Sequence, residues 1–208
     1  AKELSYLEDI IVSSDSNKYL ELASKYNINT EKRPIELALD SSTTESAIVY
    51  TIKNLLKENK VTDKDYFCLL QATSPIRRRS LSNQLKNLIS SNYYDSVISV
   101  NKETSFEWMY DSKECNTISP KYDLGKRPMR QVILKNNKER LIENGSFYCS
   151  RISSIIQSNL RVSGRIGFVT CNEYENLEID NKAEYSLIDC ILREEINKGN
   201  TNDFAYCK

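Results

Sequence analysis

The chain has 208 residues, which is enough for one domain with a substantial hydrophobic core. Its 29 basic and 29 acidic residues give a formal net charge of zero, and this balance argues against a nucleic-acid-binding protein, because such proteins usually carry a basic excess. The sequence contains no histidine, which excludes Ser-His-Asp and Cys-His nucleophilic schemes and any metal site with histidine ligands.

The six cysteines are scattered along the chain without any Cys-x-x-Cys pair. Three of them, Cys68, Cys149 and Cys190, lie inside apolar segments, where a cysteine behaves as a small buried hydrophobe. No stretch has the length of a transmembrane segment, and no signal-peptide pattern is visible. These features predict a reduced, cytoplasmic protein with no membrane partner and no nucleic-acid partner.

Strand and helix patterns alternate along the chain. In order, the first half predicts a strand over 9–14, a helix over 19–26, a helix over 43–59, a strand over 65–70, a helix over 80–91 and a strand over 96–100. Such a βαβ succession is typical of parallel sheets with right-handed crossovers. We therefore predict a three-layer α/β/α architecture with a mostly parallel, Rossmann-like sheet.

The rhythm breaks in the middle of the chain. Residues 106–131 contain strand fragments, turn residues and mixed charge, and they leave the pattern of the sheet. The pattern resumes with a strand over 145–149, a helix over 152–159, a strand over 166–170 and a helix over 182–197. We predict a single domain over 1–208 with a small arm inserted at about 101–142. We expect the protein to be a homodimer whose interface is formed by this arm.

The most informative segment follows a short apolar strand. It contains Gln71, Thr73 and Ser74, which offer hydrogen-bond donors and acceptors. Pro75 then ends the strand, and Arg77 adds a charge suited to a carboxylate or phosphate. Polar residues at the end of a buried strand are typical of ligand sites in open α/β sheets. An ordinary strand-to-helix loop with a capping serine is the alternative interpretation.

Two carboxylates, Glu178 and Asp180, lie between the last predicted strand and the last predicted helix. In an extended segment, residues i and i+2 point the same way. These side chains can therefore share a Mg²⁺ ion, which prefers oxygen ligands and takes one or two carboxylates plus substrate phosphates. In the alternative interpretation, Asp180 only N-caps the final helix.

Three other clusters are polar enough to bind ligands. Arg33 precedes a hydroxyl-rich run at 40–45, which stands at a predicted helix start, where free backbone N–H groups favour anions; helix capping explains the run equally well. The run 126–131 places three cations in the inserted arm, as an anion site or as a salt-bridged arm. Asn144 and Gly145 predict a tight turn into the next strand, with glycine providing the unusual backbone geometry.

In their order along the chain, these segments resemble the acylneuraminate cytidylyltransferases, the CMP-sialic acid synthetases. The resemblance covers nearly the whole chain. The matching segments are Ser13-Ser14-Asp15-Ser16, Arg33-Pro34, Asp40-Ser41-Ser42-Thr43, Leu70-Gln71-Ala72-Thr73-Ser74-Pro75, Tyr94-Asp95-Ser96-Val97, Lys126-Arg127-Pro128 with Arg130-Gln131, Glu143-Asn144-Gly145-Ser146-Phe147-Tyr148 and Glu178-Ile179-Asp180.

This resemblance implies a nucleotidyltransferase in which the anomeric hydroxyl of a nine-carbon acidic sugar attacks the α-phosphate of CTP, with Mg²⁺ as cofactor. The products are a CMP-sugar and pyrophosphate. The resemblance also implies that the arm reaches the active site of the neighbouring subunit in a homodimer. It places the protein in the cytoplasm, or in the nucleus if it is of the animal type.

The resemblance assigns roles to individual residues. The residues implied to bind the nucleotide are Arg33, Ser42, Thr44 and Gln71. The residues implied to bind the sugar are Gln71, Arg130, Asn144 and Tyr148. Glu178 and Asp180 are implied to hold Mg²⁺, and Gln71 and Asp180 to act in catalysis.

Three features depart from the family's pattern. The family's first strand and the phosphate-binding loop after it have no counterpart, which predicts an N-terminally incomplete domain without turnover of its own. Glu178 stands where the family usually has Asp, and residues 131–138 read as an insertion before Glu143. The alternative functions are a non-catalytic homologue that binds nucleotide or a partner, and a cytidylyltransferase for legionaminic acid or Kdo.

Overall fold

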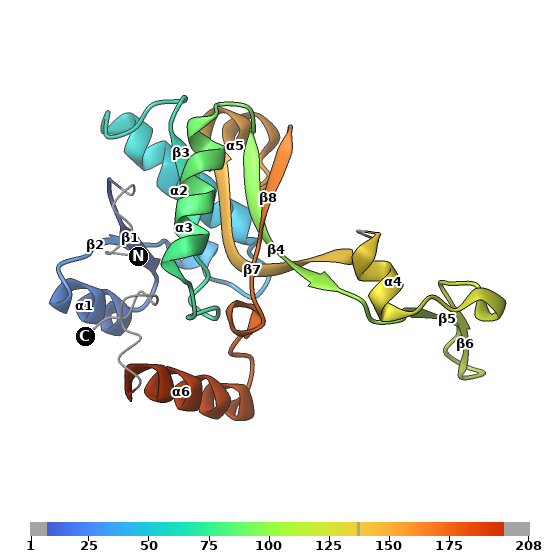
Figure 1. Cartoon of the computed structure of the whole chain (residues 1–208). Helices are drawn as coiled ribbons and strands as arrows, with labels where there is room; N and C mark the ends of the chain where they lie inside the picture. The colour runs from blue at the N-terminus through green and yellow to red at the C-terminus, as the bar shows by residue number, and fades with distance from the viewer. Residues whose placement is uncertain (1–7, 137, 198–208) are drawn as a thin grey trace.

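A four-stranded sheet forms the centre of the fold (Figure 1). The computed structural model describes residues 8–136 and 138–197. The strand order is β3 (Tyr66–Leu69), β7 (Arg140–Arg151), β4 (Ser96–Glu103) and β8 (Ile166–Thr170). β8 is parallel to β4, whereas β7 runs antiparallel to β3 and β4. Three of the four strands therefore point in one direction, and the strand predicted over 145–149 is the antiparallel one.

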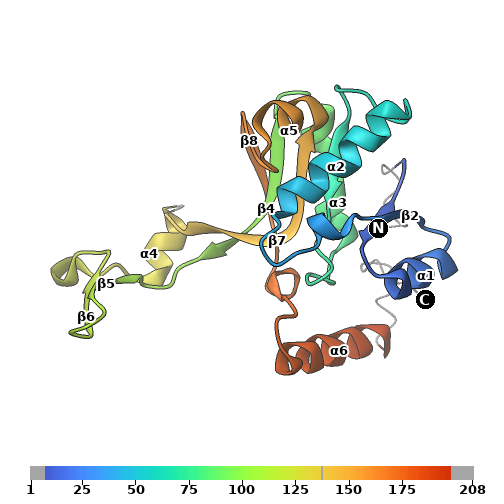
Figure 2. The same cartoon turned by 180° about the vertical axis from the view of Figure 1, so that it is seen from behind.

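Helices cover both faces of this sheet (Figures 1 and 2). One face carries α3 (Arg79–Ser90), and the other carries α2 (Thr44–Lys57) and α5 (Ile152–Ser158). The core under α3 consists of Leu81, Leu85, Val97, Phe147, Cys149, Val169 and Cys171, and the core under α2 and α5 consists of Ile48, Ile52, Ile152 and Ile155. The structure therefore has the α/β/α layers that the sequence predicts.

A smaller sheet lies beside the first one. Its elements are β1 (Ile11–Ser14), α1 (Asn17–Lys25) and β2 (Asn29–Lys32), with the two strands parallel. Within the described residues, no backbone pairing joins it to the four-stranded sheet. Glu31 instead fixes β2 to α2, because its carboxylate accepts hydrogen bonds from Thr51 Oγ1 (2.5 Å) and Asn54 Nδ2 (3.0 Å).

Residues 101–142, of which 137 is not described, project from the body as an arm (Figures 1 and 2). At its base the end of β4 pairs with the start of β7. Further along the chain are β5 (Trp108–Ser112), β6 (Thr117–Pro120), the 3₁₀ helix η2 (Leu124–Lys126) and α4 (Arg130–Lys135). Arg140 braces the base through ion pairs to Glu103 (3.3 Å) and Glu107 (2.7 Å).

The last described helix, α6 (Lys182–Asn197), lies at the lower end of the sheet in Figure 1. Its residue Ile188 packs with Ile76, and both contact Leu177 and Ile179 in a third apolar cluster. Two further 3₁₀ helices are η1 (Ile35–Leu37) and η3 (Tyr174–Asn176). Among the helices of the described chain, none is long and apolar enough to cross a membrane.

Candidate active site

β7 contains a bulge in its middle. Ser99 of β4 alone lies opposite residues 144–147 of β7. The Ser99 hydroxyl fills this irregularity, since its Oγ accepts a hydrogen bond from the Phe147 N–H (3.0 Å) and donates one to the Phe147 carbonyl (3.2 Å). The turn predicted at Asn144 and Gly145 is therefore wrong, and the segment is a bulge within one continuous strand.

The glycine of this bulge allows two polar side chains to meet. Gly145 has a φ of +64°, a conformation that disfavours other residues. A Cβ atom at this position would lie 2.5 Å from Glu178 Oε1, and closer still to Gln71 Oε1. Gln71 follows β3 and Glu178 follows β8, so the structure brings together two residues predicted from separate segments. Glycine provides the unusual backbone geometry that the sequence predicts.

Arg77 holds the segment after β3 in place. Its Nε donates to the Ser146 carbonyl (2.8 Å), and its Nη2 donates to the Gln71 carbonyl (2.8 Å). The sequence suggests Arg77 as a ligand for carboxylate or phosphate. In the structure this side chain instead positions the backbone on both sides of Gly145.

Glu175 is a buried carboxylate that sequence analysis missed. It is 4 % exposed, and its two oxygens accept hydrogen bonds from the Arg78 N–H (2.8 Å) and the Asn172 N–H (3.0 Å). These two amides belong to the segments after β3 and β8. Glu175 therefore fixes the segment that carries Gln71 to the segment that carries Glu178.

The start of α6 settles one of the sequence alternatives. The Asn181 Oδ1 atom accepts hydrogen bonds from the N–H groups of Ala183 (2.9 Å) and Glu184 (3.0 Å). Glu184 Oε2 in turn accepts from the N–H groups of Asp180 (2.7 Å) and Asn181 (3.1 Å), which completes a capping box. Asn181 thus caps α6, and the interpretation of Asp180 as the capping residue is wrong.

The donor set of Glu178 and Asp180 suits a divalent cation with oxygen ligands. Leu177 and Ile179 pack in the same apolar cluster, and the Ile179 N–H donates to the Thr73 carbonyl (2.8 Å). Alternation along this segment therefore leaves Glu178 and Asp180 on the opposite side. Within the described chain, no cluster of three or more acidic, cysteine or histidine side chains forms a metal site. Two carboxylates completed by substrate phosphates are a typical Mg²⁺ arrangement.

Asn144 and Tyr148, both predicted to bind sugar, are buried in the structure. The Asn144 amide donates to Asn101 Oδ1 (2.9 Å) and accepts from the Ser146 N–H (3.2 Å), so it holds the bulge. The Tyr148 hydroxyl donates to Glu143 Oε1 (2.6 Å). Burial, together with this hydrogen bond to Glu143, raises the pKa of Tyr148 above its usual value.

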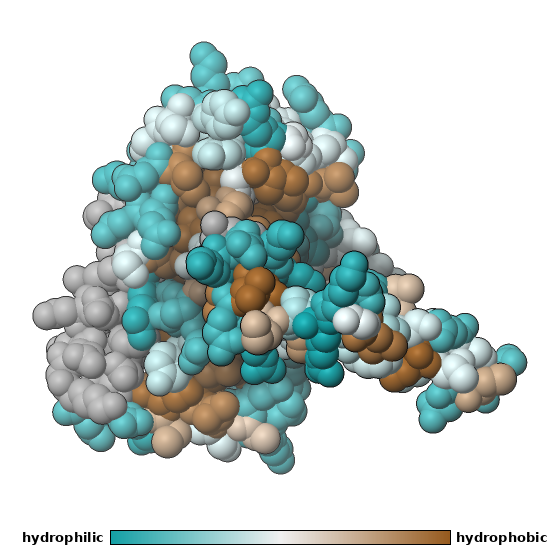
Figure 3. Space-filling view, turned by 45° about the vertical axis from the view of Figure 1, so that its right-hand side comes forward, coloured by the Kyte–Doolittle hydropathy of each residue, from teal (hydrophilic) through white to brown (hydrophobic). Residues whose placement is uncertain are grey.

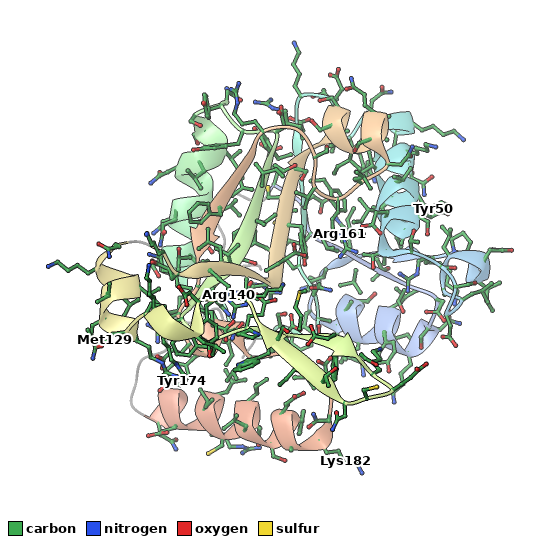
Figure 4. All side chains as sticks on the ribbon, turned by 90° about the vertical axis from the view of Figure 1, so that its right-hand side faces the viewer. Tyr50, Met129, Arg140, Arg161, Tyr174 and Lys182 are labelled. Atoms are coloured by element: carbon green, nitrogen blue, oxygen red, sulfur yellow. The ribbon has the colours of Figure 1, made fainter. Side chains whose placement is uncertain are left out.

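Arg161 lies between the sheet and α2 (Figure 4), and sequence analysis missed it as well. Its Nε donates to Glu45 Oε1 (2.5 Å) in the first turn of α2, and its Cζ lies 5.1 Å from the centre of the Tyr148 ring. Burial works against the charge of Glu45, but the hydrogen bond and charge of Arg161 outweigh it and hold the Glu45 pKa below its usual value.

The predicted nucleotide residues other than Gln71 lie in two places, at the start of α2 and directly after β2. Ser42 and Thr44 are at the start of α2, where Thr43 Oγ1 accepts from the Ser46 N–H (3.2 Å) as the N-cap. The Ser42 hydroxyl donates to a backbone carbonyl (2.7 Å). Arg33 directly follows β2 and forms an ion pair with Asp15, at 3.7 Å. The capping interpretation of the hydroxyl run is thus correct for Thr43.

Arg130 is the predicted site residue that a single chain does not bring to this site. It is the first residue of α4 and is exposed on the projecting arm. The other predicted sugar residues are on the body instead, since Gln71 directly follows the end of β3 and Asn144 and Tyr148 are in β7. Figure 1 shows these strands in the central sheet.

Comparison with curated proteins returns sialic-acid-activating enzymes. N-acylneuraminate cytidylyltransferase A of Danio rerio is 27% identical over 182 residues, covering 86% of this chain and 40% of that protein. N-acylneuraminate cytidylyltransferase of Streptococcus agalactiae serotype III (strain NEM316) is 28% identical over 160 residues, covering 69% and 36%. The chain is similar to N-acylneuraminate cytidylyltransferases. It spans about 40% of the length of the Danio rerio relative. No protein-family model matches the sequence.

Solved structures give the fold. A 4-diphosphocytidyl-2C-methyl-D-erythritol synthase superposes with a TM-score of 0.64 at 10% identity, covering 92% of this chain and 85% of that one. A CMP:2-keto-3-deoxy-manno-octonic acid synthetase complexed with CTP gives a TM-score of 0.58 at 11% identity, with 93% and 86% covered. The predicted Rossmann-like α/β fold is therefore confirmed.

Proposed function

We propose that this chain carries the CTP site and the sugar site of a cytidylyltransferase that activates a sialic-acid-type nine-carbon sugar. The observation that carries the proposal is the meeting of Gln71 and Glu178 over Gly145. These residues follow the ends of β3 and β8, and open α/β sheets bind ligands at the carboxyl ends of their parallel strands. The similarity to N-acylneuraminate cytidylyltransferases supports the choice of nucleotide and sugar.

The proposed chemistry is a displacement at phosphorus. The anomeric hydroxyl of the sugar loses its proton to solvent, its oxygen forms a bond to the α-phosphorus of CTP, and the bond from that phosphorus to pyrophosphate breaks. Glu178 and Asp180 would hold Mg²⁺, which neutralises phosphate charge when bound. The Gln71 amide can donate to one substrate and accept from the other, so it would fix their relative position.

We propose Arg33, Ser42 and Thr44 as the cytidine contacts. Ser42 and Thr44 stand at the N-terminus of α2, and hydroxyl side chains can donate hydrogen bonds to and accept them from the polar groups of a base or ribose. Tyr148 and Asn144 would shape the floor of the sugar pocket, because both are buried and lie in β7, the strand that contains Gly145.

We further propose a homodimer in which Arg130 acts in the partner's site. The arm exposes large apolar side chains, and some of them are visible in Figure 3. These residues are Trp108, Met109, Tyr110, Ile118, Leu124, Met129, Val132 and Leu134. Apolar patches of this kind mark protein interfaces. In such a dimer the guanidinium of Arg130 could pair with the sugar carboxylate through two hydrogen bonds.

An assay of the natural full-length protein with CTP, Mg²⁺ and a panel of acidic sugars tests the activity. The panel contains N-acetylneuraminic acid, legionaminic acid and Kdo, and the readouts are pyrophosphate release and CMP-sugar by mass spectrometry. We expect Asp180→Asn to lower kcat/KM about 100-fold. The matched control is Asp189→Asn, which removes only a surface ion pair to Arg193. CTP binding without product from any sugar would favour the non-catalytic alternative, and absence of CTP binding would exclude both.

Mixing two variants tests the shared site. Arg130→Ala damages only the arm, and Asp180→Asn damages only the body of the site. Random exchange between the two populations puts one intact site in each mixed dimer, so we expect about a quarter of the wild-type rate to return. A monomer in light scattering, or no recovery on mixing, would contradict the proposal.

A further inference from the structure

We propose that Arg161 is a positioning residue that couples nucleotide binding to sugar binding; this inference rests on the proposed function. Arg161 contacts one element that carries proposed nucleotide residues and one that carries proposed sugar residues. Neither contact is local in the sequence, since Glu45 and Tyr148 come from α2 and β7.

The contact toward the nucleotide is an ion pair. Arg161 Nε donates to Glu45 Oε1 at 2.5 Å, and the two side chains are only 27% and 23% exposed. Glu45 is in the first turn of α2, directly after Thr44. A part-buried ion pair is weakly screened by solvent, so the position of the guanidinium depends on the position of this helix start.

The contact on the side of the proposed sugar residues is a cation–π contact with the ring of Tyr148. The Arg161 guanidinium carbon lies 5.1 Å from the centre of the Tyr148 ring, which is 6% exposed. A cation at this distance attracts the face of the ring. The Tyr148 hydroxyl in turn donates to Glu143 at 2.6 Å, directly before the bulge. A shift of the guanidinium therefore changes the orientation of Tyr148, which lies in the same strand as Gly145.

A hydrogen bond fixes the backbone of Arg161 to the central sheet. The position of its side chain is therefore set by the sheet and not by the surrounding loop alone. The Arg161 carbonyl accepts a hydrogen bond from Ser150 Oγ at 2.6 Å. Ser150 is 1% exposed, and its hydroxyl also bonds Ser96 Oγ at 2.8 Å. The planar guanidinium can stack on a ring while one edge pairs with a carboxylate, and a lysine ammonium cannot reproduce both contacts.

The inference is tested by the thermodynamic coupling between the two substrates. Calorimetry measures the Kd of N-acetylneuraminic acid in the natural full-length protein, with and without Mg²⁺ and the α,β-methylene analogue of CTP, whose carbon bridge prevents turnover. In the wild type we expect the nucleotide to tighten sugar binding about 5-fold or more. Arg161→Lys keeps the charge and Glu45→Gln keeps the volume, and we expect either change to reduce this factor to near 1.

Arg165→Ala is the matched control, because Arg165 stacks on Tyr93 with its Cζ 4.1 Å from the ring centre, away from the proposed site. We expect its coupling factor to match the wild type, and thermal unfolding confirms that each variant is folded. Two outcomes would overturn the role of Arg161 but not the proposed function. Either the coupling factor of Arg161→Lys and Glu45→Gln equals that of the wild type, or the two substrates bind to the wild type without coupling. A wild type that binds neither CTP nor sugar would overturn the proposed function, and this inference with it.

Discussion

Glu175 allows the connection between the two site segments to be measured as a free energy. The variant Glu175→Ala removes a carboxylate that is 4% exposed and leaves the N–H groups of Arg78 and Asn172 without their acceptor. An unsatisfied buried donor costs about 1–3 kcal/mol. Water entering the new cavity recovers part of the cost of both donors, so we expect the free energy of unfolding to fall by about 2–4 kcal/mol.

The assay is urea unfolding followed by circular dichroism, with Glu184→Ala as the control. Glu184 also accepts hydrogen bonds from two backbone N–H groups, at 2.7 and 3.1 Å, but these bonds are exposed at the start of α6. Its loss should cost about 1 kcal/mol or less, because water replaces the carboxylate. Equal losses from the two variants would refute the reasoning, since burial is the only large difference between the two carboxylates.

Three further predictions concern single positions. Gly145→Ala should lower the free energy of unfolding by about 2 kcal/mol or more, measured by urea unfolding, because its φ is +64° and the added Cβ has no space; an unchanged midpoint would contradict this. Burial raises the pKa of the Cys171 thiol to about 11, whereas Cys115 is exposed. A disulfide reagent at pH 8 should therefore label Cys115 long before Cys171, as measured by peptide mass spectrometry. Equal labelling rates of the two cysteines in the folded protein would contradict this. Because Arg161 holds the Glu45 pKa below its usual value, the ionised carboxylate stabilises the fold at neutral pH, and protonation removes this as pH falls through the lowered pKa. Glu45→Gln should therefore be less stable than the wild type at pH 7, by less than about 1 kcal/mol, and the difference should narrow below about pH 4; a difference independent of pH would contradict this.

The helices of the body, unlike α4 in the arm, were predictable because their apolar spacing directly reports which face is buried. In α2, Ile48 and Ile52 are four residues apart, and both are almost fully buried against α5 and the sheet. The same holds for β3, whose apolar run packs on both of its faces. These patterns are sufficient to predict the α/β/α layers, since one buried face determines on which layer an element packs.

β2 could not be predicted in this way. Its sequence Asn-Thr-Glu-Lys has no large apolar side chain, so no periodicity marks it as a strand. The strand forms because it pairs with β1 and because Glu31 bonds Thr51 and Asn54 of α2. Those partners are 20 and 23 residues away, and a local pattern does not contain them.

The sequence contains the signal for the start of α6, but the interpretation that takes Asp180 as the N-cap is one residue too early. Asn181 followed by Glu184 has the spacing of a capping box, in which the first side chain and the fourth each bond the other's backbone. Asp180 is one position too early for this motif. The capping box changes the proposed chemistry, because the Asp180 carboxylate then takes no part in the helix cap and is available to the proposed metal site.

The segment around Gly145 shows why a local signal can fix a backbone conformation and still leave its structure open. A glycine with positive φ suits a hairpin turn and a bulge equally well. In a hairpin the residues on either side of the turn pair with each other, whereas here both sides of β7 pair with β4. Ser99 stabilises the bulge, because its hydroxyl bonds both backbone groups of Phe147 at the point where the pairing register of β4 and β7 shifts. On the backbone of this bulge, a side chain at position 145 would enter the space beside Gln71 and Glu178, so the missing Cβ of Gly145 is what leaves room for the proposed site.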